Sequence, residues 1–127
     1  MVNEVFTHFD GDDIGPGLEI LLLDGLLEEA SRYSRQISEA MQDLGRHVTS
    51  IPGTRIIVLG GDDLVATWPT KEIDLNIIME LQKRFEFHSS RTISVGIGAN
   101  SRAALENLHR AKLLGRNRII STIDGLE

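Results

Sequence analysis

The sequence predicts an α+β fold of the ferredoxin-like type, with elements in the order βαββαβ followed by one more helix and one more strand. Two observations carry this prediction. Short β-branched and aromatic runs alternate with longer segments in which apolar residues recur every three or four positions. With 127 residues, of which 41% are hydrophobic and 25% charged, the chain has the composition of one ordinary globular domain over residues 1–127.

The first predicted strand covers residues 2–10, which mix β-branched, aromatic and apolar side chains over a short span. A turn rich in Gly, Asp and Pro follows at residues 11–17. The helical pattern runs from residue 18 to about residue 45, and Gly25 is the point at which it can divide into two helices. We expect the very apolar segment 20–23 to pack in the core, with a purine pocket or a subunit contact as alternatives.

Two apolar runs, at residues 55–59 and 64–68, flank the sequence Gly-Gly-Asp-Asp at residues 60–63, which predicts a β-hairpin with the acidic pair at its tip. Two like charges ~4 Å apart repel by about 4 kcal/mol at an effective dielectric near 20, which favours a bound cation over a purely structural role for the pair. If the first strand pairs beside this hairpin, Asp10 and Asp62 converge in the arrangement of a two-metal phosphoryl-transfer site.

The second half of the chain supplies the remaining elements. Residues 72–87 and 101–114 read as amphipathic helices, and Leu105 is expected on the inward face of the second of these. Between them, residues 92–98 alternate strictly and place glycines on one face, so that a helix or a ligand must approach the backbone closely there. Residues 116–123 complete the pattern as a final strand.

Composition excludes several classes of function. The chain has no cysteine, which rules out disulfides and thiolate metal sites, and its net charge of −6 argues against direct nucleic-acid binding. No segment approaches the ~20 apolar residues of a membrane span, so we expect a cytoplasmic protein. The four histidines show no zinc-site spacing. His8 lies near Asp10 on the predicted strand, where we expect core or sheet packing for it, with contact to the site as the alternative.

Three stretches resemble one superfamily in order and spacing: Phe-Asp-Gly-Asp-Asp-Ile-Gly at residues 9–15, the Gly-Gly-Asp-Asp hairpin, and Arg-Ala-Lys-Leu-Leu-Gly-Arg-Asn-Arg-Ile at residues 110–119. The first two resemble the palm domain of the type III CRISPR polymerase subunit and its relatives, the GGDEF diguanylate cyclases. The third resembles the C-terminal segment of GGDEF domains. The chain as a whole is most similar to the stand-alone minimal CRISPR polymerases (mCpol). Leu64 stands where GGDEF has Phe, and the R-x-x-D product-inhibition motif is missing.

This resemblance implies a divalent metal, Mg²⁺ (or Mn²⁺), held by Asp10, the Gly11 carbonyl, Asp62 and Asp63. The three aspartates are the implied catalytic residues. Asp63 acts either as a further metal ligand or by helping to deprotonate the attacking hydroxyl.

The resemblance also implies the nucleotide contacts. The backbone amides of Asp12, Asp13 and Ile14 would hold the β- and γ-phosphates at the entrance to a helix. Lys112 and Arg116, four residues apart on one helix face, would clamp the triphosphate, the alternative being an exposed basic helix end. The implied nucleotide-binding set comprises Gly11, Asp12, Asp13, Ile14, Gly15, Gly60, Gly61, Lys112 and Arg116.

The activity implied by the resemblance is that of a nucleotidyltransferase. It would condense nucleoside triphosphates, ATP favoured, into a cyclic dinucleotide or a short cyclic oligonucleotide and release pyrophosphate. Because one palm of this size holds one triphosphate, a homodimer is expected. The product would serve as a second messenger in antiphage defence and bind a separate effector protein. The alternatives are a mononucleotide cyclase, a nucleotide hydrolase and a degenerate palm that binds nucleotides as a sensor.

Overall fold

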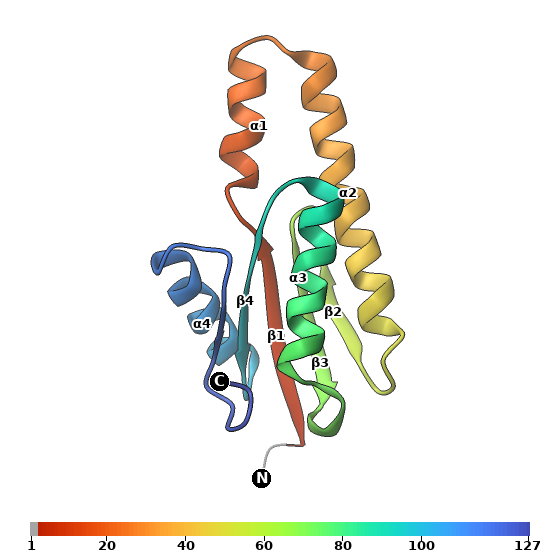
Figure 1. Ribbon diagram of the computed structural model, residues 1–127, viewed down its shortest axis with the longest axis vertical. Helices are drawn as coiled ribbons and strands as arrows, with labels where there is room; N and C mark the ends of the chain where they lie inside the picture. Colours follow the sequence, from red (N-terminus) through yellow and green to blue (C-terminus); the bar gives the residue numbers. More distant parts are fainter. Residues whose placement is uncertain (1–2) are drawn as a thin grey trace.

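The computed structural model describes residues 3–127, which form a five-stranded sheet in the order β2-β3-β1-β4-β5 (Figure 1). The strands are β1 (Glu4–Gly11), β2 (Arg55–Leu59), β3 (Asp63–Pro69), β4 (Ile93–Gly98) and β5 (Ile119–Ser121). The helices are α1 (Ile14–Leu23), α2 (Leu27–Thr49), α3 (Leu75–Ser89) and α4 (Ser101–Leu113), with a 3₁₀ turn η1 (Thr70–Glu72). Within these residues, no helix is both long and apolar enough to cross a membrane.

The sheet confirms the predicted fold class. The central strand β1 pairs antiparallel with β3 on one side and with β4 on the other, and β2 pairs antiparallel with β3. This is the ferredoxin-like arrangement for the first four strands, to which β5 adds a parallel edge beside β4. Apolar side chains from α2, α3 and one face of the sheet form the core, with Phe9, Val95 and Phe85 among its members.

Helix α4 covers the opposite face of the sheet, where β4 carries almost no side chains. A Cβ atom added to Gly96 would collide with backbone atoms of Ala104 and Leu108, and one added to Gly98 would lie 2.7 Å from the Ala104 nitrogen. The sequence left open whether a helix or a ligand approaches the glycine face. The structure shows that it is a helix, which therefore packs backbone against backbone on β4.

The segment from α1 to α2 projects beyond the end of the sheet (Figure 1). Helix α1 begins at Ile14 rather than at residue 18, and Gly25 separates the two helices with a φ of 71°, as its position in the pattern predicted. The prediction that residues 20–23 pack in the core is wrong, because Ile20, Leu22 and Leu23 are 59%, 51% and 84% exposed. Helix α2 covers only one side of α1, and the sheet does not extend this far.

Other boundaries shift by a few residues. Strand β1 extends through Gly11, one residue past the predicted end, while residue 2 lies outside the described residues. Helix α3 starts after Asp74, whose side chain accepts a hydrogen bond from the Ile77 amide at 2.9 Å as an N-cap. The final strand is shorter than predicted. In α4 the inward placement of Leu105 is wrong: it is 40% exposed, and the buried polar residue Asn107 occupies the inward face instead.

Substituting Gly96 by Ala tests the close approach of α4 to β4. The added methyl group must push the helix away from the sheet, so we expect the free energy of unfolding to fall by about 1–3 kcal/mol, measured by urea denaturation. Gly15→Ala is the matched control, because a Cβ atom at Gly15 would have no neighbour within 4 Å. An unchanged urea midpoint for Gly96→Ala would contradict this packing.

Candidate functional site

The end of β1 and the tip of the β2–β3 hairpin meet, as the sequence predicted. Asp10 and Asp63 are direct partners in the antiparallel register of β1 and β3. The Gly11 amide donates a hydrogen bond of 2.8 Å to the Asp62 carbonyl, which fixes the tip against β1. Asp10 and Asp62 border one cavity of about 290 Å³, together with the start of α1 and the end of α4.

A cluster of three side chains that could bind a cation lies beside this cavity. Ligand atoms of His8, Asp10 and Asp63 all lie within 4.8 Å of one another, and His8 Nε2 is 3.4 Å from Asp63 Oδ2. This placement agrees with the alternative for His8, contact with the site, and not with the packing role that we expected first. The strand alternation contained the signal, because residues two apart on β1 share a face of the sheet.

The donor set of this group fits a divalent cation. Carboxylate oxygens suit Mg²⁺ and Mn²⁺, and an imidazole nitrogen is a more favourable ligand for Mn²⁺ than for Mg²⁺. Asp62 borders the cavity but does not belong to the group that includes His8. The Gly11 carbonyl, a metal ligand by the resemblance, accepts a hydrogen bond of 3.0 Å from Lys112 Nζ. A carbonyl oxygen has two lone pairs, so this bond leaves one acceptor position.

Electrostatics at Asp10 also favour a cation. Burial raises the pKa of Asp10 above its usual value, Lys112 opposes this rise, and the charges of Asp62 and Asp63 add to it. Lys112 Nζ lies 3.1 Å from Asp10 Oδ1. One ammonium group therefore neutralises only part of the negative charge gathered at the end of β1.

Asp12 points away from the cavity and into the protein. Its side chain is 4% exposed, and hydrogen bonds from Lys112, Thr92 and Ser94 hold the pKa of its carboxyl below the usual range despite the opposing effect of burial. Its amide donates to the Thr92 carbonyl at 2.9 Å. This amide is therefore not free for a phosphate, contrary to the expectation from the resemblance.

The N-terminus of α1 forms the opposite wall of the cavity. Asp13, Ile14 and Gly15 border it, and the first amides of a helix have no partner within the helix, so they attract anions. Asp13 adopts the left-handed region with a φ of 55°. Arg116 Nε lies 3.1 Å from Asp13 Oδ1, which places a second cation at the same cavity as Lys112.

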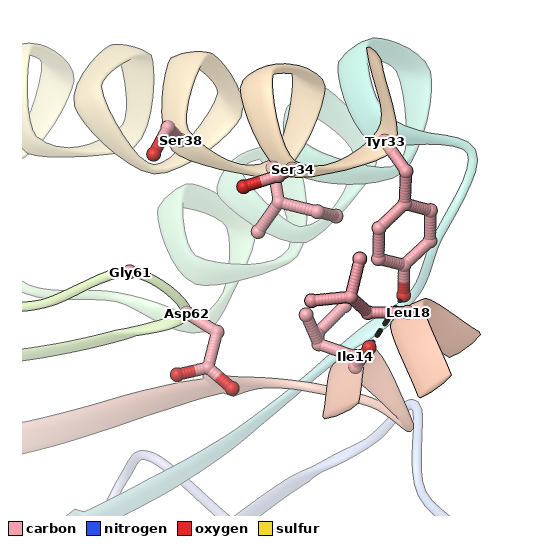
Figure 2. Close-up of a pocket in the computed structure, with 8 residues that line it drawn as sticks. Ile14, Leu18, Tyr33, Ser34, Ser38, Gly61 and Asp62 are labelled. Carbon is pink, nitrogen blue, oxygen red and sulfur yellow. Dashed lines mark hydrogen bonds between the residues drawn. The ribbon is translucent and has the colours of Figure 1, made fainter. Parts of the chain in front are cut away.

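A second cavity, of about 160 Å³, lies between α1, α2 and the hairpin tip (Figure 2). Tyr33 closes one end by donating a hydrogen bond of 2.8 Å to the Ile14 carbonyl. Ser34 and Ser38 border the cavity one helical turn apart on α2. Its lining comprises Ile14, Leu18, Tyr33, Ser34, Ile37, Ser38, Gly61 and Asp62.

The two glycines of the hairpin have different surroundings. Gly61 borders the second cavity, whereas Gly60 borders neither of the two. The Gly60 amide donates to the Asp63 carbonyl at 2.9 Å, and a Cβ atom at Gly60 would lie 2.6 Å from Asp63 Oδ1. The structure thus gives Gly60 a role in the tight turn that presents Asp63.

The neighbouring carboxyls Asp10 and Asp12 should respond oppositely to substitution. Without metal at neutral pH, Asp10→Asn should raise the free energy of unfolding, because a raised folded pKa means that the ionised form is disfavoured in the fold. This gain should vanish as the pH falls through the raised pKa.

Asp12→Asn should instead lower the free energy of unfolding by about 1–3 kcal/mol, because the buried donors around Asp12 lose their ionised acceptor. That loss should shrink as the pH falls through the lowered pKa of Asp12. Urea denaturation at several pH values measures both, and equal signs would contradict the analysis.

Solved structures that share this fold include nucleotide-binding proteins. A chain of the Csm1-Csm4 cassette in complex with cA4 matches with a TM-score of 0.65 and 19% identity, over 92% of this chain and 20% of that chain. The GGDEF domain of DgcB from Caulobacter crescentus in complex with c-di-GMP matches with a TM-score of 0.60 and 15% identity, over 94% and 77% respectively. A chain of the diguanylate cyclase SiaD with its activator SiaC from Pseudomonas aeruginosa matches with a TM-score of 0.61 and 16% identity, over 95% and 50%.

These likenesses show a common fold, and this chain spans about a fifth of the matched Csm1-Csm4 chain. No curated protein matches the sequence. The family described as the minimal CRISPR polymerase domain, mCpol, matches residues 6–122, which include the acidic strand end, the hairpin and the basic end of α4. The chain therefore belongs to the minimal CRISPR polymerase family.

Proposed function

We propose that this protein is a metal-dependent nucleotidyltransferase that joins nucleoside triphosphates, ATP favoured, into a cyclic dinucleotide or a short cyclic oligonucleotide. One observation carries the proposal: the carboxylates of Asp10 and Asp62 share a cavity with the N-terminus of α1 and with Lys112 and Arg116. A site for a cation and a site for an anion are thus joined in one space. A metal-bound triphosphate has both charges in that arrangement.

Each wall of the cavity has a separate task. The amides of Asp13, Ile14 and Gly15 donate to the terminal phosphates, and Arg116 and Lys112 neutralise them from the other side. Asp10 and Asp63 hold Mg²⁺ or Mn²⁺, with Asp62 and the Gly11 carbonyl as further oxygen donors. The metal, when bound, lowers the pKa of a ribose hydroxyl and offsets the charge of the triphosphate.

The chemistry is an in-line displacement at the α-phosphorus. A ribose hydroxyl oxygen of one nucleotide forms a bond to the α-phosphorus of the other, and the bond from that phosphorus to the bridging oxygen breaks, releasing pyrophosphate. The carboxylate oxygen of Asp63 that does not hold the cation would accept the hydroxyl proton. A second displacement in the reverse direction closes the ring.

The second cavity supports a nucleobase position. Ile14, Leu18 and Ile37 supply apolar walls, and the hydroxyls of Ser34 and Ser38 can each donate and accept a hydrogen bond. A hydroxyl group donates and accepts equally well, so this pair fits the pairing edge of any nucleobase, and the preference for ATP in this proposal rests on the family resemblance.

A second copy of the chain supplies the other nucleotide in this proposal. In this proposal the cavity of about 290 Å³ holds one triphosphate, and ring closure needs two. The projecting tip of α1 and α2 exposes Leu23, Leu26 and Leu27 at 84%, 43% and 67%, which offers apolar surface to a partner. The product is proposed to act on a separate effector protein in cytoplasmic antiphage signalling.

Turnover tests the proposed activity. The protein is incubated with each of the four ribonucleoside triphosphates and with Mg²⁺ or Mn²⁺, and the products are identified by mass spectrometry. We expect a cyclic product and pyrophosphate from ATP. Combining Asp62→Ala with Asp63→Ala should lower the rate by at least about a hundredfold. Loss of a residue that only hydrogen-bonds to a metal ligand can already have an effect of that size, and here the proposed ligands themselves are removed.

Asp124→Ala, a change of an exposed aspartate outside the site, is the control and should keep full activity. Products limited to a cyclic mononucleotide or a nucleoside diphosphate would replace the proposal with one of the alternative activities. Undiminished turnover in the double variant would remove the metal assignment.

Self-association tests the role of the apolar tip. Sedimentation velocity should show a dimer of the wild-type chain, and Leu23→Glu should weaken it by about tenfold or more, because a charge replaces a buried apolar contact. Phe87→Glu on α3 is the matched control, since Phe87 is also 84% exposed. Dimers of equal strength in both variants would place the interface elsewhere.

A further inference from the structure

Asp12 is the one charged residue among residues 3–127 whose side chain is buried in the interior, with 4% exposure. It lies in the turn between β1 and α1, next to the candidate site. The cavity that holds the proposed triphosphate is bordered by Asp10, Gly11 and Asp13 but not by Asp12. The carboxylate of Asp12 therefore contacts other parts of the protein and not the proposed nucleotide.

Four donors converge on this carboxylate from three other parts of the chain. Oδ1 accepts from Ser94 Oγ at 2.7 Å and from Lys112 Nζ at 2.8 Å. Oδ2 accepts from Thr92 Oγ1 at 2.7 Å and from the Asn117 amide at 2.9 Å. The carboxylate thus joins the start of β4, the end of α4 and the turn that follows α4.

The contact with Lys112 fixes a flexible side chain. Besides Asp12, its ammonium group contacts the carbonyls of Asp10 and Gly11, each at 3.0 Å. These contacts hold Nζ at the end of β1, directly beside the carboxylate of Asp10. A free lysine side chain would otherwise sample many rotamers.

The contact with the Asn117 amide fixes a strained turn. Arg116 and Asn117 both occupy the left-handed region, with φ of 68° and 52°, which residues other than glycine seldom adopt in succession. The Asn117 amide donates to Asp12 Oδ2 and also lies 3.0 Å from Ser94 Oγ. Through this turn the carboxylate of Asp12 fixes the backbone position from which the Arg116 side chain extends to Asp13.

We propose that Asp12 is a positioning residue that holds the positive charges of Lys112 and Arg116 beside the terminal phosphates without touching the nucleotide. This inference rests on the proposed function. It differs from a purely structural role in one respect: loss of Asp12 should weaken binding of a triphosphate and leave binding of a monophosphate nearly unchanged.

Calorimetric titration tests the inference with two probes in the presence of Mg²⁺. The probes are AMP and an ATP analogue with a methylene group between its α- and β-phosphorus atoms, which prevents turnover. Asp12→Asn should weaken binding of the analogue by about tenfold and that of AMP by less than about twofold. In a Lys112→Ala background, the same substitution should weaken the analogue by only about threefold or less, because its main partner is already gone.

Asp43→Asn is the matched control. Asp43 is a second shielded carboxylate, 15% exposed, and accepts hydrogen bonds from Arg84 of 3.0 and 3.2 Å between α2 and α3. Its substitution removes the same charge away from the site and should leave both affinities unchanged. Ser94→Ala serves if Asp12→Asn does not fold, because it removes one bond to Asp12 and one to Asn117; it should weaken the analogue by about threefold and spare AMP.

Distinct outcomes overturn distinct claims. Equal losses for both probes, additive losses in the Lys112→Ala background, or unchanged binding of the analogue would each overturn the positioning role of Asp12. Failure of the wild-type chain to bind either probe would instead overturn the proposed function.

Discussion

The accumulation of negative charge at the end of β1 is the constraint on which this site depends. Strand pairing brings together Asp10, Asp62 and Asp63. Burial raises the pKa of Asp10, and the charges of the other two aspartates add to this rise. The fold tolerates this arrangement because Lys112 lies 3.1 Å from Asp10. A single ammonium group leaves residual negative charge, which is the property that a cation-binding site requires.

The position of Lys112 in turn depends on how closely α4 can approach the sheet. The glycine face of β4 lets the helix backbone lie directly on the strand. In the last turn of α4, Lys112 reaches the carbonyls of Asp10 and Gly11 at the end of β1. Any larger residue at Gly96 would move the helix and its cation together. The glycines of β4 therefore contribute to the charge balance of the site, because they allow α4 to place Lys112 beside Asp10.

Much of this architecture could be predicted from sequence because it depends on local signals. Strand alternation, helical periodicity and the Gly-Gly-Asp-Asp hairpin indicated the element order. The meeting of Asp10 with the hairpin followed only on the condition that the first strand pairs beside it, which the structure shows. The predictions that failed were those about which side chains are buried. Leucine at residues 22 and 23 resembles core sequence, yet it is exposed because α2 packs against only one side of α1 and no further described element covers the projecting end.

The order of strands and helices and the identity of the acidic and basic groups follow from the sequence, since periodicity and residue chemistry are properties of short segments. The surroundings of each group depend instead on the tertiary structure. It turned Asp12 inward to four donors, brought His8 within 3.4 Å of Asp63, and engaged the Asp12 amide with Thr92. These contacts join residues far apart in the chain, and their geometry depends on sheet register and helix packing, which no local pattern specifies.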